Sequence, residues 1–595
     1  MIRRPLRPLA RIMTARARGE NPDRIEAEAR AARMRQRHKA ERLRAEYRLL
    51  LLAATFLLAF GTVATRMSVL AASDPQEPRV ASAASQIVAQ RADIVDRNGA
   101  ILATNMMTAS LYAQPHLMVD KPAAAAGLAR IFEDLDETDL LRRFSGKRKF
   151  IWIKRSLSPE QRQAVHDLGE PGLQLGPREM RLYPNGRLAA HILGGYGFGR
   201  EGVHAAEVIG SAGVEFTFDR YLRDPAEGGA PLELSIDLSV QAAVERVLAG
   251  GMRLMNAKGA AAVLMEADTG QIIAMTSLPD FDPNQRPKPP VSGDPSDSPI
   301  FNRAAQGVYE LGSTFKIFTV AQAMELGLVG PDTMIDTKGP LTWGRFRIRD
   351  FRDYGPRLST RDVIVKSSNI GTARIAVEIG AERQAAFLRS LGFLDPVPVT
   401  LPEAGKTKPL VPKRWSEIST MTVSYGHGLA ATPLHLATAY ASVVNGGLRV
   451  TPTLLKSDRR PGEADRILSE GTSRILRGFL RGVVEGGTAT LADVEGYRVG
   501  GKTGTADKPR HTGGYYDDKV IGTFAAIFPA NEPKYVLVVS LDEPEDRTGR
   551  EPRRTAGWTA APVAAEIIRR IAPLMNLRPL PKEGGEGISA VHAAN

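Results

Sequence analysis

The longest apolar stretch of the chain lies near its N-terminus. Residues 49–65 read LLLLAATFLLAFGTVAT and contain no charged side chain, and the apolar character continues to about Ala72. At about 1.5 Å of rise per residue, a helix of this length crosses a hydrocarbon core of about 30 Å. Arg66 lies near the far end, where a long side chain reaches the headgroups. The pattern predicts a single transmembrane helix over residues 49–72.

A buried core helix and a cleaved signal peptide are the alternatives for this stretch. The 48 residues that precede it are too many for an ordinary signal peptide, and no clear small-x-small cleavage site stands out, although Ala71-Ala-Ser73 comes near to one. An uncleaved span is therefore the favoured interpretation.

The charge pattern predicts how this helix is oriented. Of the net charge of +13, residues 1–48 carry +9, from 15 Lys/Arg against 6 Asp/Glu. Because Lys and Arg are retained on the inner side, we expect a basic cytoplasmic tail over 1–48 and everything after the span outside. Anionic lipid, rather than nucleic acid, is the expected partner of the tail. Residues 23–47 are rich in Ala, Glu and Arg, which favours a helix that continues inward from the membrane.

Residues 73–231 are expected to form an elongated, non-catalytic domain, which we call the pedestal. Residues 91–103 have the pattern of two short strands around an Asn98-Gly99 turn. From 104 to about 230, the sequence predicts helical segments alternating with Gly/Pro turns. No catalytic group of residues is visible there, so its polar residues are interpreted as structural ion pairs and hydrogen bonds, for example Arg181, Tyr183 and Glu215.

Residues 232–578 have the pattern of a second domain, followed by a loose tail over 579–595. An amphipathic helix is predicted over 238–255 and a final helix over 560–571, with a long helical insert between two groups of strands. This order indicates a mixed α+β fold in which helices cover both faces of an antiparallel sheet. The Pro-rich segment 282–299 is expected to be a long exposed loop. The predicted strands are 260–267, 271–278, 497–505, 520–528 and 534–541.

Composition excludes several kinds of chemistry. The chain has no cysteine, which rules out disulfides, a zinc-thiolate site and a cysteine nucleophile. Its nine histidines form no His-Glu-x-x-His pair, and no metal-ligand cluster is visible in the sequence. We therefore expect no metal site.

Three short motifs carry the candidate chemistry: Ser313-Thr-Phe-Lys316, Ser367-Ser-Asn369 and Lys502-Thr-Gly-Thr505. Each alone has an ordinary structural explanation, as a serine cap beside a snorkelling lysine or as a turn. Together they contain the parts of a serine acyl-transfer site in which lysine handles the protons.

The first motif opens an apolar segment that is predicted to be a buried helix. Residues three apart share a helix face, so the Lys316 amine can reach the Ser313 hydroxyl. The free N–H groups of a helix N-terminus favour developing negative charge. A serine hydroxyl needs a neighbouring base, and lysine serves as one when burial and nearby cations lower its pKa.

The other two motifs have the groups that such a reaction still needs. Ser367 is expected to relay a proton between Lys316 and the leaving amine, and the Asn369 amide to hold a substrate carbonyl. On the strand that carries the third motif, Gly504 allows a ligand to approach the backbone closely. In the same motif, we expect Lys502 and Thr503 to bind a carboxylate, and the Thr505 N–H to complete an oxyanion hole with that of Ser313.

With these motifs, the chain resembles the class B penicillin-binding proteins, the membrane-anchored peptidoglycan DD-transpeptidases. The Lys366-Ser-Ser-Asn-Ile370 form is most similar to the division-specific FtsI-type branch, also called penicillin-binding protein 3. Leu311 departs from the family, which usually has proline there, and this is expected to alter the rigidity of the helix entry. The resemblance extends to Asp93–Gly99, Gly213-Val-Glu215, Thr269-Gly270, Asp282-Pro-Asn284, Asn302-Arg303, Ser424-Tyr-Gly-His-Gly428 and Thr432-Pro433.

The resemblance implies a transpeptidase fold with a five-stranded antiparallel sheet flanked by helices. It implies that Ser313 attacks the D-Ala–D-Ala carbonyl of a stem peptide, that Lys316 is the base, and that Ser367 and Lys502 complete the proton network. The acyl-enzyme is then resolved by the amine of a neighbouring stem. No cofactor is implied, and β-lactams are expected to bind the same site.

The same resemblance implies a place and a set of partners. The protein is expected in the bacterial inner membrane as a single-pass protein, with its catalytic domain in the periplasm at the division septum. No glycosyltransferase domain is visible, so glycan polymerisation is expected from a partner among other division-complex membrane proteins. An elongation-type transpeptidase, a β-lactamase or DD-carboxypeptidase, a membrane-anchored β-lactam sensor and a catalytically idle scaffold are the alternatives.

Overall fold

The computed structural model describes residues 7–72, 91–201, 206–224, 229–510 and 513–580. It divides into two compact units, Met1–Val88 and Ala89–Asn595. Most of the predicted tail over 579–595 lies outside the described residues.

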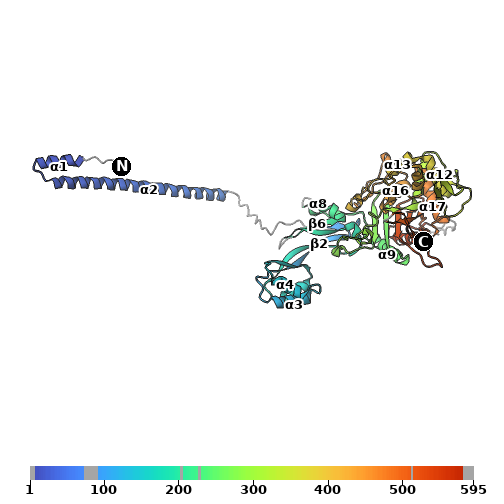
Figure 1. The fold of residues 1–595 in the computed structure, drawn as a ribbon, viewed down its shortest axis with the longest axis horizontal. Helices are drawn as coiled ribbons and strands as arrows, with labels where there is room; N and C mark the ends of the chain where they lie inside the picture. Colours follow the sequence, from blue (N-terminus) through green and yellow to red (C-terminus); the bar gives the residue numbers. More distant parts are fainter. Residues whose placement is uncertain (1–6, 73–90, 202–205, 225–228, 511–512, 581–595) are drawn as a thin grey trace, which may run out of the picture. The chain divides into compact units, whose positions relative to one another are not determined.

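The first unit consists of two helices. Helix α1 (Arg7–Ala17) lies along helix α2 (Pro22–Ala72), which runs for 51 residues without a break (Figure 1). Within α2, the stretch Glu46–Met67 is the one described segment that is long and apolar enough to cross a membrane, and none of it is buried against protein. The predicted helical continuation of the span into the basic tail is therefore confirmed.

The pedestal begins with the predicted hairpin. Strand β1 (Ile94–Val95) pairs antiparallel with β2 (Ile101–Ala113), and the turn between them is held by the Asp96 carboxylate, which accepts hydrogen bonds from the N–H groups of Asn98 and Ala100. Gly99 has φ +85°, a conformation that suits glycine. The Asn98-Gly99 turn signal is thus confirmed.

The rest of the pedestal contains more strand than the sequence predicted. Strand β2 pairs on its two sides with β3 (Ile151–Leu157) and β4 (Leu173–Leu182), and β5 (Gly195–Glu201) pairs with β6 (Ala206–Ala212). The expectation of helical segments was wrong for these strands, because pairing with strands distant in the sequence decides their conformation. Helical segments do occur between the strands, at α3 (Lys121–Ile131), α4 (Glu137–Phe144), α5 (Pro159–Asp167), α6 (Ala190–Leu193), α7 (Gly213–Thr217) and α8 (Asp219–Arg223).

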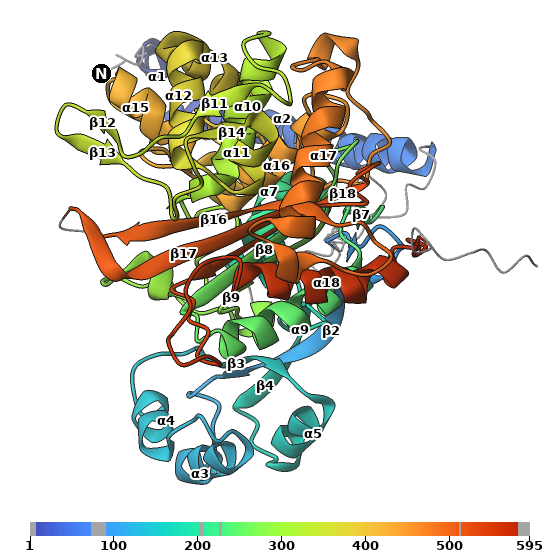
Figure 2. The same cartoon turned by 90° about the vertical axis from the view of Figure 1, so that its right-hand side faces the viewer.

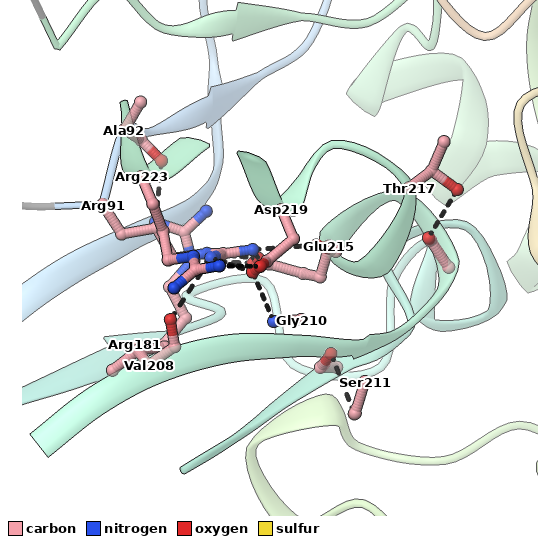
Figure 3. A network of polar contacts seen from close by, with 12 residues as sticks. Arg91, Ala92, Arg181, Val208, Gly210, Ser211, Glu215, Thr217, Asp219 and Arg223 are labelled. Carbon is pink, nitrogen blue, oxygen red and sulfur yellow. Dashed lines mark hydrogen bonds and ion pairs between the residues drawn. The ribbon is translucent and has the colours of Figure 1, made fainter. Parts of the chain in front are cut away.

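A buried cluster of charges fixes one end of the pedestal (Figure 3). Both oxygens of the Glu215 carboxylate are paired, one with Arg91 at 2.6 Å and the other with Arg181 at 2.7 Å. Arg91 also contacts Asp219 at 2.7 Å, and the Tyr183 hydroxyl donates to Glu215. Since Glu215, Arg91 and Arg181 are all buried, the predicted structural role of this polar group is confirmed.

The C-terminal part of the second unit is built on a five-stranded antiparallel sheet in the order β16-β17-β18-β8-β9. The bounds are β8 (Gly259–Glu266), β9 (Ile272–Leu278), β16 (Gly500–Pro509), β17 (Tyr515–Phe528) and β18 (Tyr535–Asp542). All five predicted strands are present. The β16–β17 hairpin is longer than predicted, because its outer residues are polar and half exposed and carry no apolar alternation.

Helices cover both faces of this sheet (Figure 2). Helices α9 (Leu238–Leu254) and α18 (Ala560–Leu574) pack together on one face, and α16 (Pro433–Val444) and α17 (Glu470–Gly486) cover the other. Strand β18 is buried along nearly its whole length between these layers. The Pro-rich segment is a loop containing two short 3-10 turns, η2 (Pro283–Gln285) and η3 (Pro295–Asp297).

Candidate active site

Ser313 lies on a tight turn that leads into a buried helix. The turn is a 3-10 helix, η4 (Gly312–Phe315), and α10 (Lys316–Glu325) begins directly after it. The sequence predicted a single helix entry at this point, whereas the structure places the serine one turn before the α-helix. Gly312 has φ +55°, and a Cβ there would lie 2.8 Å from the Thr505 carbonyl oxygen, so the close approach of strand β16 requires glycine.

Buried contacts hold the nucleophile turn in place. The Tyr440 hydroxyl of α16 donates to the Thr314 carbonyl at 2.9 Å, and the Thr314 hydroxyl donates to the Leu311 carbonyl at 2.8 Å. Phe315 packs against Phe393 with ring centroids 4.6 Å apart. These side chains are all buried, so the turn is fixed by the core of the domain rather than by proline before Gly312.

The second motif joins two helices. Helix α11 (Thr360–Val365) ends just before Ser367, and α12 (Asn369–Ile379) begins after Ser368, whose hydroxyl caps it by accepting from the Gly371 N–H. Ser367 has φ +63°, a strained conformation for a residue other than glycine. This backbone conformation directs the Ser367 hydroxyl and carbonyl toward Lys316 of the first motif.

Asp350 anchors this junction, although no sequence motif predicts its role. One carboxylate oxygen accepts hydrogen bonds from the Asn369 and Ile370 N–H groups, and the other accepts from the Ser368 hydroxyl. The Asn369 side chain donates to the Arg349 carbonyl at 2.9 Å. Asp350 lies in an irregular segment without a local motif, so only tertiary structure reveals its contact with the start of α12.

The third motif lies on an edge strand. Strand β16 has one neighbour in the sheet, β17, and its other side faces η4. A Cβ at Gly504 would lie 2.1 Å from the Leu311 carbonyl oxygen, so only glycine lets the strand approach the nucleophile turn. The Thr503 hydroxyl is 2.6 Å from that of Thr488, a second contact that the sequence analysis missed, and the Thr505 hydroxyl accepts from the Ala556 N–H at 3.0 Å.

The predicted nucleophile, base and relay groups come together in one hydrogen-bonded chain. Lys316 Nζ lies 2.9 Å from Ser313 Oγ, 3.0 Å from Ser367 Oγ and 2.6 Å from the Ser367 carbonyl oxygen. Lys502 Nζ lies 2.9 Å from the same Ser367 hydroxyl. A proton can therefore pass between the two lysines through Ser367 without any rearrangement of the backbone.

Burial lowers the proton affinity of both lysines. The two side chains are completely inaccessible to solvent. Burial, and after it the positive charge of Lys502, holds the pKa of Lys316 well below its usual value of 10.5, and Asp350 opposes this effect. Burial lowers the pKa of Lys502 to about 7. A neutral lysine amine can accept the serine proton, which an ammonium cannot do.

A second group of side chains borders the site on the side of η4. Strand β10 (Tyr309–Glu310) precedes the nucleophile turn and pairs with β15 (Ala430–Ala431). Glu310 accepts hydrogen bonds from the Gly428 N–H at 2.8 Å and from the Tyr515 hydroxyl at 3.0 Å. Among the described residues, no cluster of His, Cys, Asp and Glu suits a metal ion.

Comparison with known proteins agrees with this arrangement. Residues 260–569 match the family described as the penicillin binding protein transpeptidase domain, and residues 86–229 match the penicillin-binding protein dimerisation domain. The chain is 35% identical to a probable peptidoglycan D,D-transpeptidase FtsI from Caulobacter vibrioides over 82% of both chains. It is 29% identical to the peptidoglycan D,D-transpeptidase FtsI of Escherichia coli, over 83% of this chain and 85% of that one.

A solved structure shows the same fold. The crystal structure of penicillin-binding protein 3 from Mycobacterium tuberculosis, complexed with aztreonam, superposes with a TM-score of 0.62 at 26% identity, and covers 83% of this chain and 97% of that one. Fold, motif order and sequence similarity thus agree, and the chain belongs to the penicillin-binding protein transpeptidases that carry a dimerisation domain before the catalytic domain.

Proposed function

We propose that this protein cross-links peptidoglycan stem peptides during cell division, through an acyl-enzyme on Ser313. The observation that carries the proposal is the 2.9 Å contact between Ser313 Oγ and the amine of a fully buried lysine, Lys316. Similarity to FtsI proteins over more than four fifths of the chain supports both the reaction and the division role.

In the proposed acylation, Lys316 takes the Ser313 proton as the oxygen attacks the D-Ala–D-Ala carbonyl. The bond to the terminal D-Ala breaks, and its nitrogen receives the proton through Ser367 and Lys502. The contacts of Ser367 with both lysines, at 3.0 and 2.9 Å, support this route. The amine of a second stem then attacks the ester and releases Ser313, which forms the cross-link.

The substrate is proposed to lie along strand β16. Its free edge beside η4 suits an extended peptide, since an edge strand offers unpaired backbone groups. We assign Asn369 to the substrate carbonyl, Thr503 to the substrate carboxylate and the N–H groups of Ser313 and Thr505 to the oxyanion. Gly504 is assigned to the substrate site through its backbone, since the space on its Cα side is filled by the Leu311 carbonyl of the nucleophile turn.

The proposed domain organisation follows from the same reading: residues 1–48 as cytoplasmic tail, 49–72 as membrane helix, 73–231 as pedestal, 232–578 as transpeptidase domain and 579–595 as tail. We place the catalytic domain in the periplasm and the protein at the septum, with a glycosyltransferase and other division-complex membrane proteins as partners. The exposed apolar stretch Glu46–Met67 and the excess of Lys/Arg before it support this topology.

Labelling with a fluorescent penicillin tests the reaction. Membranes containing the full chain are expected to give a stable label that disappears in Ser313→Ala and falls by about 100-fold or more in rate in Lys316→Ala, because general base catalysis contributes at least that much. Lys508→Ala, on the same strand as Lys502, is the control and is expected to label normally. A label that persists in Ser313→Ala would reject the proposal.

The lifetime of the label, a stem-peptide assay and a fluorescent fusion distinguish three of the alternatives. Rapid loss of the label would indicate a β-lactamase, and release of D-Ala from a stem peptide without formation of a cross-link would indicate a carboxypeptidase. A fluorescent fusion that follows the side wall instead of mid-cell would indicate an elongation role.

A further inference from the structure

Glu310, three residues before the nucleophile, has one carboxylate oxygen without a hydrogen bond. Its Oε1 accepts from both the Gly428 N–H and the Tyr515 hydroxyl, whereas Oε2 is buried and has no hydrogen-bond partner. A buried carboxylate oxygen without a donor is costly, and such groups in native structures call for an explanation. We infer that Glu310 Oε2 receives a hydrogen-bond donor during the reaction.

His427 is the side chain that faces this oxygen. Its Nδ1 lies 3.6 Å from Glu310 Oε2, which is longer than a hydrogen bond, and its side chain is 34% exposed. The imidazole stacks on the Tyr515 ring with centroids 5.6 Å apart. In a free enzyme, contacts of this kind are often long and tighten only when substrate binds.

The backbone brings His427 close to the acyl-enzyme. The preceding residue, Gly426, touches the residue before the nucleophile: the Gly312 N–H donates to the Gly426 carbonyl at 3.3 Å. A Cβ at Gly426 would lie 2.0 Å from the Gly312 carbonyl oxygen. His427 is thus one residue away from a direct contact with the nucleophile turn, and Tyr515 comes from the hairpin that carries Lys502.

The proposed cross-linking step leaves one proton without an acceptor. A primary amine is an ammonium ion at neutral pH, so it must lose one proton before it can attack and a second when the amide forms. The chain of Lys316, Ser367 and Lys502 can pass one proton from the attacking nitrogen to Ser313 Oγ as the ester breaks. The first proton needs a separate base, located where the acceptor enters.

We propose that Glu310 and His427 form the acceptor-amine site, in which Glu310 attracts the ammonium group and orients the imidazole, and His427 takes its first proton. This inference rests on the proposed transpeptidase function. The neutral amine then attacks the acyl carbon, a C–N bond forms, and the C–O bond to Ser313 breaks. Lys316 carries the second proton to Ser313 Oγ, and the imidazolium releases the first to water.

The tyrosines around His427 are consistent with His427, and not a phenol, acting as the base. Burial, followed by the charge of Glu310, raises the pKa values of Tyr425 and Tyr515 to about 12, so both phenols keep their protons at neutral pH. Tyr515 therefore donates to Glu310 and cannot act as the base. Imidazole is the side-chain type suited to accepting protons near neutral pH, and Glu310 Oε2 faces it at 3.6 Å.

Separate measurement of the two half-reactions tests the proposal. The full-length protein in detergent is acylated with a thioester stem-peptide analogue, and the acyl-enzyme is then offered a stem-peptide amine. In His427→Gln, acylation is expected to stay within about twofold of wild type, whereas aminolysis falls by about 100-fold or more, since a general base contributes at least about that much. The residual aminolysis is expected to rise with pH in proportion to the free amine.

Hydroxylamine, which is uncharged at neutral pH, is the matched acceptor. Because it needs no prior deprotonation, His427→Gln is expected to use it at nearly the wild-type rate. His427→Phe, which keeps an aromatic ring against Tyr515, is measured in the same way and is expected to show the same pattern even if His427→Gln folds poorly. Glu310→Gln is expected to lose aminolysis by the stem-peptide amine as well.

Two results would overturn the proposal: wild-type aminolysis by the stem-peptide amine in both His427 variants, or an equal loss with hydroxylamine, which would show a structural role. Absence of Ser313 acylation in the wild-type protein would instead reject the proposed transpeptidase function, so the two failures are distinguishable.

Discussion

The Ser367 hydroxyl oxygen lies 2.9 Å from Lys502 Nζ, so a single strained serine joins two buried lysines. Lys316 Nζ approaches the same hydroxyl from the other side, at 3.0 Å. Two amines that share one hydroxyl in a solvent-free site cannot both be charged without strong repulsion. The electrostatic state of one lysine therefore depends on the other.

Replacing Lys502 by Ala is expected to shift the pH dependence of acylation to higher pH. Burial, followed by the charge of Lys502, keeps the pKa of Lys316 low, so loss of that charge lets the pKa rise. Less Lys316 is then neutral at a given pH, and a higher pH is needed for the same rate. Acylation rates between about pH 6 and 10 check this. Lys508→Ala is the control, and a profile in Lys502→Ala that is unchanged or moved to lower pH would contradict the prediction.

Replacing Ser367 by glycine or by alanine is expected to distinguish the effect of backbone strain on stability from the effect of losing the hydroxyl on acylation. Both variants lack the relay hydroxyl and are expected to acylate poorly. With φ +63° at this position, Ser367→Gly should be more stable than Ser367→Ala by about 1 kcal/mol, because glycine adopts this backbone conformation without penalty. Thermal denaturation of the two variants measures the difference, and equal stability would argue against strain at Ser367.

Replacing Asp350 by Ala is expected to lower both stability and acylation. Its carboxylate accepts from two N–H groups at the start of α12 and from Ser368, so the loss of these caps should cost about 1–2 kcal/mol. Asp350→Asn retains an acceptor oxygen and is expected to lose less. Chemical denaturation and penicillin labelling measure both effects. Since Asp350 acts through the Ser-Ser-Asn motif, wild-type acylation in Asp350→Ala would show that the anchor is dispensable.

Gly504→Ala is expected to disrupt the site, because its Cβ would lie 2.1 Å from the Leu311 carbonyl oxygen. The strand must then move away from the nucleophile turn, so we expect labelling to fall below detection. Gly478→Ala, in the middle of α17 with no atom within 4 Å of its Cβ, is the matched control and should gain about 0.5–1 kcal/mol. Normal labelling of Gly504→Ala would show that the strand tolerates the displacement.

Glu215→Gln tests the charge cluster of the pedestal. Removing the carboxylate leaves Arg91 and Arg181 buried without their shared partner, which is expected to cost about 3–5 kcal/mol. Glu233→Gln, which breaks a half-exposed pair with Lys456, should cost less than about 1 kcal/mol. Denaturant titration of both variants gives the comparison, and similar losses would mean that the cluster is not rigidly held.

The catalytic fold was largely predictable because its elements carry strong local signals. The short apolar runs 260–267 and 534–541, bounded by turn residues, favour buried strands, and the spacing of Ser313 and Lys316 brings their side chains together in a helical turn. The predicted nucleophile, base and relay residues do form one hydrogen-bonded chain in the structure.

The parts that could not be predicted depend on long-range contacts. Asp350 and Thr488 lie in irregular segments, and their roles appear only when the chain folds back on the Ser-Ser-Asn motif and on Thr503. The sequence pattern predicts helices where the pedestal has strands, because sheet pairing, and not periodicity, decides their conformation. The environment of the Glu310 carboxylate likewise depends on three separate segments. Gly428 and Tyr515 both donate to Oε1 from segments distant in the sequence.

The burial of Lys316 has a consequence for how the protein is monitored in cells. An unfolded or loosened chain returns this amine to water, where it is a cation and cannot activate Ser313. A covalent penicillin label therefore counts native molecules only, whereas an antibody counts every chain. The ratio of the penicillin signal to the antibody signal in one gel lane therefore measures the folded fraction of the protein in the membrane. The measurement also applies to variants that are too unstable to purify.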